Sequence, residues 1–499
     1  EIVAADPAVS TQLRERLELQ RRLSELPVSI ADARRIGEPV DALETELKAT
    51  QEAYFAVEAD LAANARLSQV SDRPADLADL QAKLKPGEGY VRLTVMADKV
   101  YGILVEQGRT TPIRPALGSD DLLRMSNDLR RTVDYDIESN RIPGFNITRA
   151  RQLYDVLFGT IDTQLRSNAE LVIDGGRLFS GITAGMLVTD RASEENFRKQ
   201  TDKADYSQVA FLAKQVATSV AISPRSFIAS REFGPTRARR ALLGMAAPVG
   251  LMSQSVGTDG TFRVGPCRVD SGRFTRTINR LAPIPATEIG IIAGALGLEG
   301  APPMLTGASF SDSEVQRRGG AGELADYKIL HFATHGVTEG LFDCADFPAG
   351  LLTSYGGNSN SDLMLSYEEI AGLRLDANLV VMSACETASQ VGEGTQLRAG
   401  EARPGDTLDG LVRSFFAAGS RAVLATYWET SNAGESEKFM AAFYSAGRDR
   451  SITQAINVAQ QSMMGARDTS HPFFWAGFFV VGQTNNQLLN GGTGRVAAR

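Results

Sequence analysis

The sequence contains few cysteines. Only Cys267, Cys344 and Cys385 occur among its 499 residues. A small, odd number of thiols in a long chain does not resemble the disulfide framework of a small secreted protein. We therefore expect Cys267 and Cys344 to have no partner, and we expect a reducing compartment, with the cytoplasm as the predicted location.

Long apolar runs and an excess of positive charge are also missing. The nearest approach to an apolar run of eighteen residues, 281–305, is broken by prolines and contains Glu288, so no membrane span is predicted. The formal net charge of -8 argues against nucleic acid as a partner, because phosphate binding needs a basic surface. With 22% charged and 43% hydrophobic residues, the chain has the composition of a globular protein, and its length predicts more than one structural unit.

The N-terminal part has the pattern of helices. Residues 8–69 place leucines mostly at three- and four-residue steps between charged residues, which predicts an amphipathic antiparallel pair with a break near Pro27 and Pro39. The heptads are not sustained, so we expect this pair to pack against the rest of the chain rather than to form an independent coiled coil. The sequence begins at Glu1 without an initiator methionine or an apolar signal segment, and we expect that an upstream part has been removed.

From Leu84 onward the pattern changes to alternating strands and helices. Residues 90–96 and 99–106 predict a hairpin, 120–133 and 147–158 predict helices, and 170–174 predicts a buried strand that ends in an Asp-Gly-Gly turn. In the second half, apolar strands near Ala241, Ile329, Leu379 and Ala422 alternate with helices, one of which begins near Ala286 or Thr287. This order predicts an α/β fold with a mostly parallel sheet and helices on both faces. The predicted units are a helical segment over 1–75, two α/β halves over 76–238 and 239–485, and a flexible tail over 486–499.

Two of these strands end at residues with reactive side chains. The apolar run that starts at Ile329 leads to His335 and Gly336, and the run that starts at Leu379 leads to Cys385. Chemistry in open α/β sheets collects beyond the carboxyl ends of the strands, so parallel neighbours would bring His335 and Cys385 together at a solvent-open rim. An adjacent imidazole can raise the thiolate fraction of a cysteine or pass a proton to a leaving amine. The alternative is a buried thiol and a nearby histidine without a joint task.

The same segments carry a family resemblance. Residues 330–336, 380–387 and 409–419, followed by Trp428, Phe443-Tyr444, Ala455-Ile456 and 471–478, resemble in order and spacing the CHAT domain. This family is a bacterial branch of the caspase-like, clan CD cysteine peptidases, related to separase, caspases and gingipains. The resemblance implies a pseudo-caspase half over 76–238 and a caspase-like catalytic half over 239–485. CHAT domains commonly follow TPR arrays, although no 34-residue repeat is visible in this chain.

The resemblance implies a cysteine endopeptidase that acts on a protein or peptide substrate. Its catalytic dyad would be Cys385 and His335, and the backbone N–H groups of Gly336 and Cys385 would form the oxyanion hole. Separases and gingipains favour a basic residue before the cut, and Asp406 or Asp409 could provide the matching carboxylate, with Asp406 preferred. No metal or other cofactor is implied. The polar segment after Glu386, up to Arg403, is predicted to be mobile and to become ordered on activation or substrate binding.

Other interpretations of these residues remain open. Gly336 could be a turn residue with positive φ, and Asp406 could cap a helix over 411–418. His331, four residues before His335, is interpreted as a core residue rather than one of a metal pair, since no third ligand is evident. His471 is expected to fix a turn before Pro472. Beside the peptidase, the chain could be a catalytically silent CHAT scaffold for protein–protein interaction or a hydrolase of non-peptide esters or amides.

Overall fold

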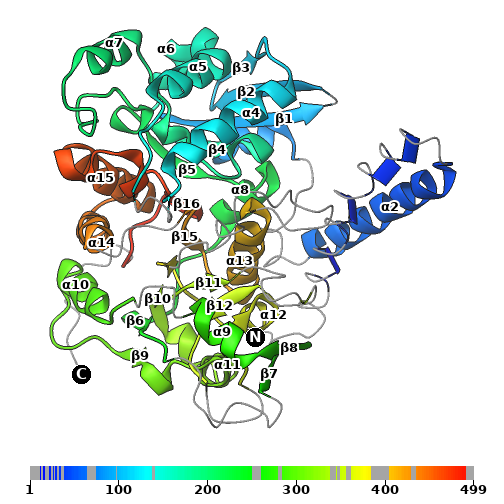
Figure 1. Ribbon diagram of the computed structural model, residues 1–499, viewed down its shortest axis with the longest axis vertical. Coiled ribbons are helices and arrows are strands. Elements are labelled where there is room, and N and C mark those ends of the chain that lie inside the picture. The colour runs from blue at the N-terminus through cyan, green and yellow to red at the C-terminus, as the bar shows by residue number, and fades with distance from the viewer. Residues whose placement is uncertain are drawn as a thin grey trace.

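The centre of the molecule is one eleven-stranded sheet, in the order β3-β2-β1-β4-β5-β16-β15-β14-β10-β6-β9 (Figure 1). The junctions β3–β2, β2–β1 and β16–β15 are antiparallel and the others are parallel. The computed structural model describes residues 39–63, 75–96, 98–136, 141–249, 260–278, 284–337, 344, 349–355, 361–383, 404–428 and 434–489 and scattered residues within 12–34, with only the backbone of 58, 61–63, 277–278 and 404–409. The strands of this sheet are β1 (Glu88–Met96), β2 (Lys99–Glu106), β3 (Arg109–Ile113), β4 (Glu170–Asp174), β5 (Ala217–Val220), β6 (Arg240–Ala246), β9 (Met304–Thr306), β10 (Tyr327–Ala333), β14 (Leu379–Met382), β15 (Ala422–Thr426) and β16 (Phe478–Gly482).

Helices surround the sheet, and α4, α5 and α10 begin within one residue of the predicted positions. The helix α5 covers the predicted range, and the Asn146 side chain caps it by accepting a hydrogen bond from the Arg149 N–H. The expected hairpin is confirmed as β1 and β2, paired antiparallel from Tyr90↔Val105 to Met96↔Lys99. The longer helices are α2 (Asp41–Ala63), α3 (Leu77–Lys83), α4 (Ser119–Arg130), α5 (Ile147–Phe158), α7 (Arg191–Lys199), α8 (Pro224–Glu232), α9 (Ser271–Ile278), α10 (Thr287–Ala295), α11 (Asp312–Gly320), α13 (Pro404–Ala418), α14 (Glu435–Ala446) and α15 (Ile452–Met464), and the short ones are α6 (Asp162–Arg166) and α12 (Tyr367–Ala371).

Two consecutive residues of β10 show that helices cover both faces of the sheet. The side chain of His331 reaches α10 and α14, where it contacts Glu288 and Tyr444. The next side chain, Phe332, packs against Phe415 of α13 with ring centroids 5.4 Å apart. Successive strand residues point to opposite faces, so α10 and α14 lie on one face and α13 lies on the other. The predicted fold class, α/β with a mostly parallel sheet and helices on both faces, is confirmed.

The two expected halves share this sheet, and the parallel strands of the first half run opposite to those of the second, except that β16 runs with the first half. Strands β1, β4, β5 and β16 are parallel to one another, and β15 is antiparallel to β16. The carboxyl ends of β10 and β14 therefore lie at the same edge of the sheet as the amino ends of β1 and β4. The turn after Asp174, at the carboxyl end of β4, lies at the opposite edge.

The few described residues within 12–34 are helical, and their contacts with α2 agree with the expected antiparallel pair. Arg16 donates a hydrogen bond to Tyr54 of α2, whereas Arg34, further along the chain, pairs with Glu44 near the start of α2. Val57 of α2 belongs to the same continuous apolar core as the sheet, and Figure 1 shows α2 extending to one side of the molecule. Among the described residues, no helix combines the length and the apolar character needed to cross a bilayer.

Two small sheets lie outside the main one, and a disulfide joins them. The first consists of β11 (Gly336–Val337), β12 (Gly350–Leu352) and β13 (Met364–Ser366), and the second of β7 (Thr261–Val264) and β8 (Cys267–Asp270). Cys267 of β8 is bonded to Cys344, which follows β11 in the chain. The expectation that these two cysteines have no partner is wrong, because the fold brings together residues that are 77 positions apart. The cysteine count therefore no longer supports a reducing, cytoplasmic location.

The end of the chain also differs from the expectation of a flexible tail from residue 486. Leu488 is fully buried and its N–H donates to the carbonyl of Gly447. Asn378 and Lys328 donate from their side chains to the carbonyls of Leu488 and Leu489. Residues 486–489 are thus part of the packed structure, and the remainder of the predicted tail lies outside the described residues.

Candidate functional site

The strands that lead to the predicted dyad are parallel neighbours. β10 and β14 pair in register from Ile329↔Leu379 to Phe332↔Met382. The N–H of Ser383 continues this register by donating to the carbonyl of Phe332 at 2.9 Å. In the sequence, His335 and Cys385 each follow the last register pair by the same number of residues. Cys385 itself lies outside the described residues, so its catalytic role stays a prediction.

The backbone around His335 is fixed by the neighbouring small sheet. β10 ends at Ala333, two residues before the histidine, and not at His335 as the apolar run suggests. The carbonyl of His335 accepts from the N–H of Leu352 at 2.8 Å, and the hydroxyl of Thr334 donates to the carbonyl of Leu352 at 2.6 Å. The side chain of His335 is only 5% exposed, so it is more enclosed than a solvent-open rim predicts. The reason is that β11 begins directly after it and pairs with β12.

Gly336, the predicted oxyanion donor, begins β11 and pairs with Leu351. It is extended and not left-handed, so the alternative role as a turn residue with positive φ is wrong. His335 and Leu352 form a hydrogen-bonded pair, and such pairs alternate with non-bonded pairs in an antiparallel ladder. The N–H of Gly336 is therefore directed away from β12. This direction is compatible with the predicted oxyanion role, which remains untested.

His331 lies in the core, as interpreted from the sequence. Its side chain is fully buried, and its Nε2 lies 2.9 Å from Glu288 Oε1 while its Nδ1 lies 2.8 Å from the Tyr444 hydroxyl. Burial, and secondly the nearby Glu288 carboxylate, raise the pKa of Tyr444 well above its ordinary value, so this hydroxyl keeps its proton. The phenol can therefore donate to Nδ1 while Nε2–H donates to the carboxylate. Both ring nitrogens are used in joining β10 to α10 and α14.

The two pocket candidates lie in the first part of α13. This helix begins at Pro404, so Asp406 is inside its first turn and cannot be the N-cap of a helix that starts at 411. The positions of the Asp406 and Asp409 side chains lie outside what the structure describes, and so does the segment 387–403 that was predicted to be mobile. At Gly410, a Cβ would lie 2.6 Å from the ring of Tyr367, so α13 packs closely on α12 at this point.

The end of β15 contains a contact that sequence reasoning missed. The guanidinium of Arg130, at the end of α4, lies 5.0 Å from the ring centre of Trp428 and donates to the carbonyl of Tyr427 at 3.2 Å. Trp428 is 1% exposed, and its indole N–H donates to the carbonyl of Phe473 at 2.9 Å. Arg130 thus links the first half of the chain to the strand next to β14. Its sequence neighbourhood gives no sign of this, because the contact spans nearly 300 residues.

His471 fixes a turn, as expected. Its Nδ1 accepts from the N–H of Phe473 at 3.1 Å, and its Nε2 contacts the carbonyl of Pro143 at 3.0 Å. Burial lowers the pKa of this imidazole to about 4, so it is neutral at pH 7. A neutral ring can accept at one nitrogen and donate from the other, which is what these two partners require.

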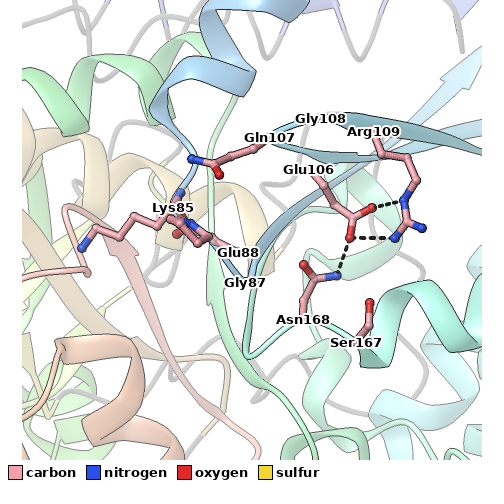
Figure 2. A pocket seen from close by; sticks show the side chains of 10 residues that line it. Lys85, Gly87, Glu88, Glu106, Gln107, Gly108, Arg109, Ser167 and Asn168 are labelled. Carbon is pink, nitrogen blue, oxygen red and sulfur yellow. Dashed lines mark hydrogen bonds and ion pairs between the residues drawn. The ribbon is translucent and has the colours of Figure 1, made fainter.

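A pocket of about 340 Å³ lies elsewhere, at the amino ends of β1 and β4 (Figure 2). Its polar groups satisfy one another: Glu106 accepts from Arg109 at 2.6 and 3.0 Å and from Asn168 at 3.2 Å, as the dashed lines show. None of the ten described residues that line it is a histidine or a cysteine. It shares a sheet edge with the carboxyl ends of β10 and β14, but β5, β16 and β15 separate it from them. It is therefore not the predicted dyad site.

Comparison with known proteins gives matches to one domain family and to several individual proteins. Residues 148–483 match the model of the CHAT domain. A segment of 126 residues is 34% identical to tetratricopeptide repeat protein 28 of Mus musculus, and it covers 24% of this chain but only 4% of that protein. One similar solved structure is the complex of the pro- and mature domains of Porphyromonas gingivalis RgpB, with 12% identity, a TM-score of 0.36 and coverage of 74% of this chain and 77% of that one. Another is the Saccharomyces cerevisiae separase–securin complex, with 9% identity, a TM-score of 0.43 and coverage of 89% of this chain and 34% of that one.

Proposed function

Because this chain belongs to the CHAT domain family, we propose that it is a caspase-like cysteine endopeptidase that cleaves specific protein partners through Cys385 and His335. The observation that carries the proposal is the parallel register of β10 and β14. The family's histidine and cysteine positions follow the same last register pair, Phe332↔Met382, on adjacent strands. A shared edge of a parallel sheet is where two such side chains can cooperate.

The proposed reaction is acyl transfer through a thioester. The sulfur of Cys385 attacks the scissile carbonyl carbon, and the carbonyl oxygen becomes an oxyanion that accepts from the N–H groups of Gly336 and Cys385. His335 takes up the thiol proton of Cys385 and passes it to the leaving amine as the C–N bond breaks. Water then hydrolyses the thioester, which releases the carboxylic acid and restores the thiol. Removing one such oxyanion donor costs on the order of 10²–10³ in rate in enzymes that use this device. No metal or cofactor takes part in these steps.

The proposed substrate has a basic residue before the cut. Asp406, or alternatively Asp409, would provide the carboxylate that binds it. Both belong to α13, whose later residue Phe415 packs against Phe332 of β10. A pocket on this helix would therefore be connected directly to the strand that leads to His335.

Control by an upstream TPR or other interaction module is part of the proposal. Two observations support it: the N-terminal helix pair, and the likeness of one segment to a protein named for its tetratricopeptide repeats. The chain matches only a small part of that relative, so its activity and partners are not transferred here.

The second candidate function is a catalytically silent CHAT scaffold for protein–protein interaction. The observation that favours it is the 5% exposure of His335, which is low for a side chain that must meet a polypeptide. An enzyme that opens only after activation would have the same feature. The two candidates differ in what they do to peptides.

A peptide library separates them. The parent protein and Cys385→Ala are incubated with the library, with and without an upstream TPR module, and the products are identified by mass spectrometry. A peptidase gives cleavage by the parent, preferably after Arg or Lys, and none by the variant. A parent that stays inert in both conditions, or a variant that cleaves equally well, overturns the peptidase proposal.

A further inference from the structure

The Cys267–Cys344 disulfide lies next to the chain segment that carries His335. Cys267 is in β8 of the two-stranded sheet, and Cys344 follows β11, the strand that begins directly after His335. A two-stranded hairpin is marginally stable alone, so β7 and β8 depend on what holds them to the rest. One link is the hydrogen bond from the Gly265 N–H to the Asp362 carboxylate at 2.6 Å. The disulfide is the covalent link.

The same region has its own apolar core, separate from the core of the main sheet. We call it the small core; Cys344 and Tyr355 pack against its buried members, which are Phe262, Val264, Cys267, Val269, Phe274, Val337, Leu352, Leu363 and Met364. These residues come from both small sheets, from α9 and, for Leu363, from the position directly before β13. A core of this size gives little stability by itself, and small units of this kind commonly need a covalent staple.

Two members of the small core connect it to the candidate site. Val337 follows Gly336 in β11, so it is the second residue after the histidine. Leu352 donates its N–H to the His335 carbonyl and accepts from the Thr334 hydroxyl. The backbone on both sides of His335 is therefore held by strands whose inner side chains pack around the disulfide.

We infer that the Cys267–Cys344 pair is a thiol–disulfide modification site, and that its bond clamps the His335 segment in the arrangement that catalysis needs. The inference rests on the proposed function for its catalytic consequence, but the clamping itself can be measured without any activity. With the bond intact, β11 and β12 hold His335 and Gly336 in place. With the bond reduced, the small core loses its staple and this segment becomes mobile.

The reductant is a dithiol, either a small molecule such as dithiothreitol or a thioredoxin-like protein. Cys267 is 1% exposed and Cys344 is half-buried, so the thiolate of the dithiol attacks the sulfur of Cys344. The S–S bond breaks, a mixed disulfide forms at Cys344, and Cys267 takes up a proton as a thiol. The second thiol of the dithiol then attacks the mixed disulfide and releases Cys344. Two electrons and two protons pass to the protein, and the dithiol leaves as a disulfide.

The clamp is tested in Cys385→Ala, where Cys267 and Cys344 are the remaining cysteines. The full chain is incubated with and without dithiothreitol, alkylated to count thiols, and followed by amide hydrogen exchange. We expect no alkylated cysteine before reduction and two after it, with exchange at Val337 and Leu352 at least tenfold faster in the reduced protein. Amides of β4 serve as the internal control and should not change. Equal exchange at Val337 and Leu352 in the two states overturns the inference.

The catalytic consequence is tested in the chain that retains Cys385, without reductant. The best library peptide is used to compare the parent with Cys267→Ala/Cys344→Ser. We expect kcat/KM to fall at least tenfold in the double variant, because a misplacement of about 1 Å can cost on the order of 10²-fold. Equal kcat/KM overturns the catalytic part of the inference. If the double variant does not fold, Cys344→Ser alone is used for the same comparison.

The two proposals fail in different ways. If exchange responds to reduction but neither parent nor variant cleaves any peptide, the peptidase proposal fails and the clamp stands. If the parent cleaves peptides and exchange does not respond, the clamp fails and the peptidase proposal stands.

Discussion

Replacing Tyr444 by phenylalanine is expected to destabilise the protein without leaving a cavity. Tyr444 and His331 are both fully buried, and the phenol oxygen lies 2.8 Å from Nδ1. Phenylalanine fills the same space but removes the hydroxyl, so a buried ring nitrogen loses its hydrogen-bond partner. Leaving such a group unsatisfied costs about 1–3 kcal/mol. We therefore expect the free energy of unfolding to fall by about 2 kcal/mol, or a factor of roughly 30 in the unfolding equilibrium constant.

Substitutions of Glu288, the other residue in contact with His331, should give a graded series of stability losses. Glu288→Gln keeps an oxygen that can accept from Nε2–H and should cost less than Glu288→Ala, which leaves that donor buried and unpaired. In a double-mutant cycle, Tyr444→Phe and His331→Leu should show a coupling energy of about 0.5–3 kcal/mol, since the two side chains are in direct contact. Tyr101→Phe is the matched control, because Tyr101 is 44% exposed and its substitution should change stability by no more than about 0.5 kcal/mol.

Urea denaturation followed by circular dichroism measures these differences as shifts of the midpoint at constant slope. Two results would contradict this expectation: a Tyr444→Phe variant as stable as Tyr101→Phe, or a cycle with His331 that shows no coupling. Either result would mean that the His331 contacts do not hold β10 to α10 and α14.

Three further predictions concern single residues. Gly350→Ala should destabilise the protein by about 1–3 kcal/mol and speed amide exchange at Leu352, because the added Cβ would lie 2.4 Å from the Leu365 carbonyl oxygen. Gly234→Ala, whose added Cβ would meet no atom within 4 Å beyond its chain neighbours, is the control for both readouts. Burial lowers the pKa of His471 from 6.5 to about 4, so the unfolded chain binds more protons than the folded chain between these pH values. Urea midpoints should therefore show stability falling as the pH drops from about 6.5 to 4, by on the order of 3 kcal/mol. His471→Asn should remove this pH dependence. Asp406→Asn should lower kcat/KM for peptides with Arg or Lys before the cut relative to neutral peptides, and an unchanged ratio would remove Asp406 from the pocket.

The sequence predicts much of the sheet because its strands are short apolar runs between turn residues. The strands β10 and β14 follow from such runs, since strands buried on both faces carry little else than apolar side chains. Their adjacency is a condition of the predicted dyad, and their parallel register shows it. The exact range of α5 follows from its apolar spacing and from Asn146 as its cap. These signals are local, and the long-range contacts of the fold do not alter the elements that they predict.

The errors concern contacts between distant parts of the chain. The Cys267–Cys344 bond joins β8 to the chain that follows β11, two segments that no local pattern connects, and the burial of Leu488 depends on Gly447, where a side chain would collide with it. Arg130 reaches the end of β15 only because the two halves share one sheet. The enclosure of His335 likewise depends on the pairing of β11 with β12, two short strands whose sequences give little indication of their partners.

The most direct test of the proposed dyad is to map where a thiol-reactive peptidyl trap with a terminal arginine binds covalently. We expect one adduct, on Cys385, formed by the parent and formed much more slowly by His335→Gln, while the two variants Cys385→Ala and Cys385→Ser form none. If the trap does not react with Cys385 in the folded protein, or labels it equally fast with and without the imidazole of His335, the two residues do not form a catalytic dyad.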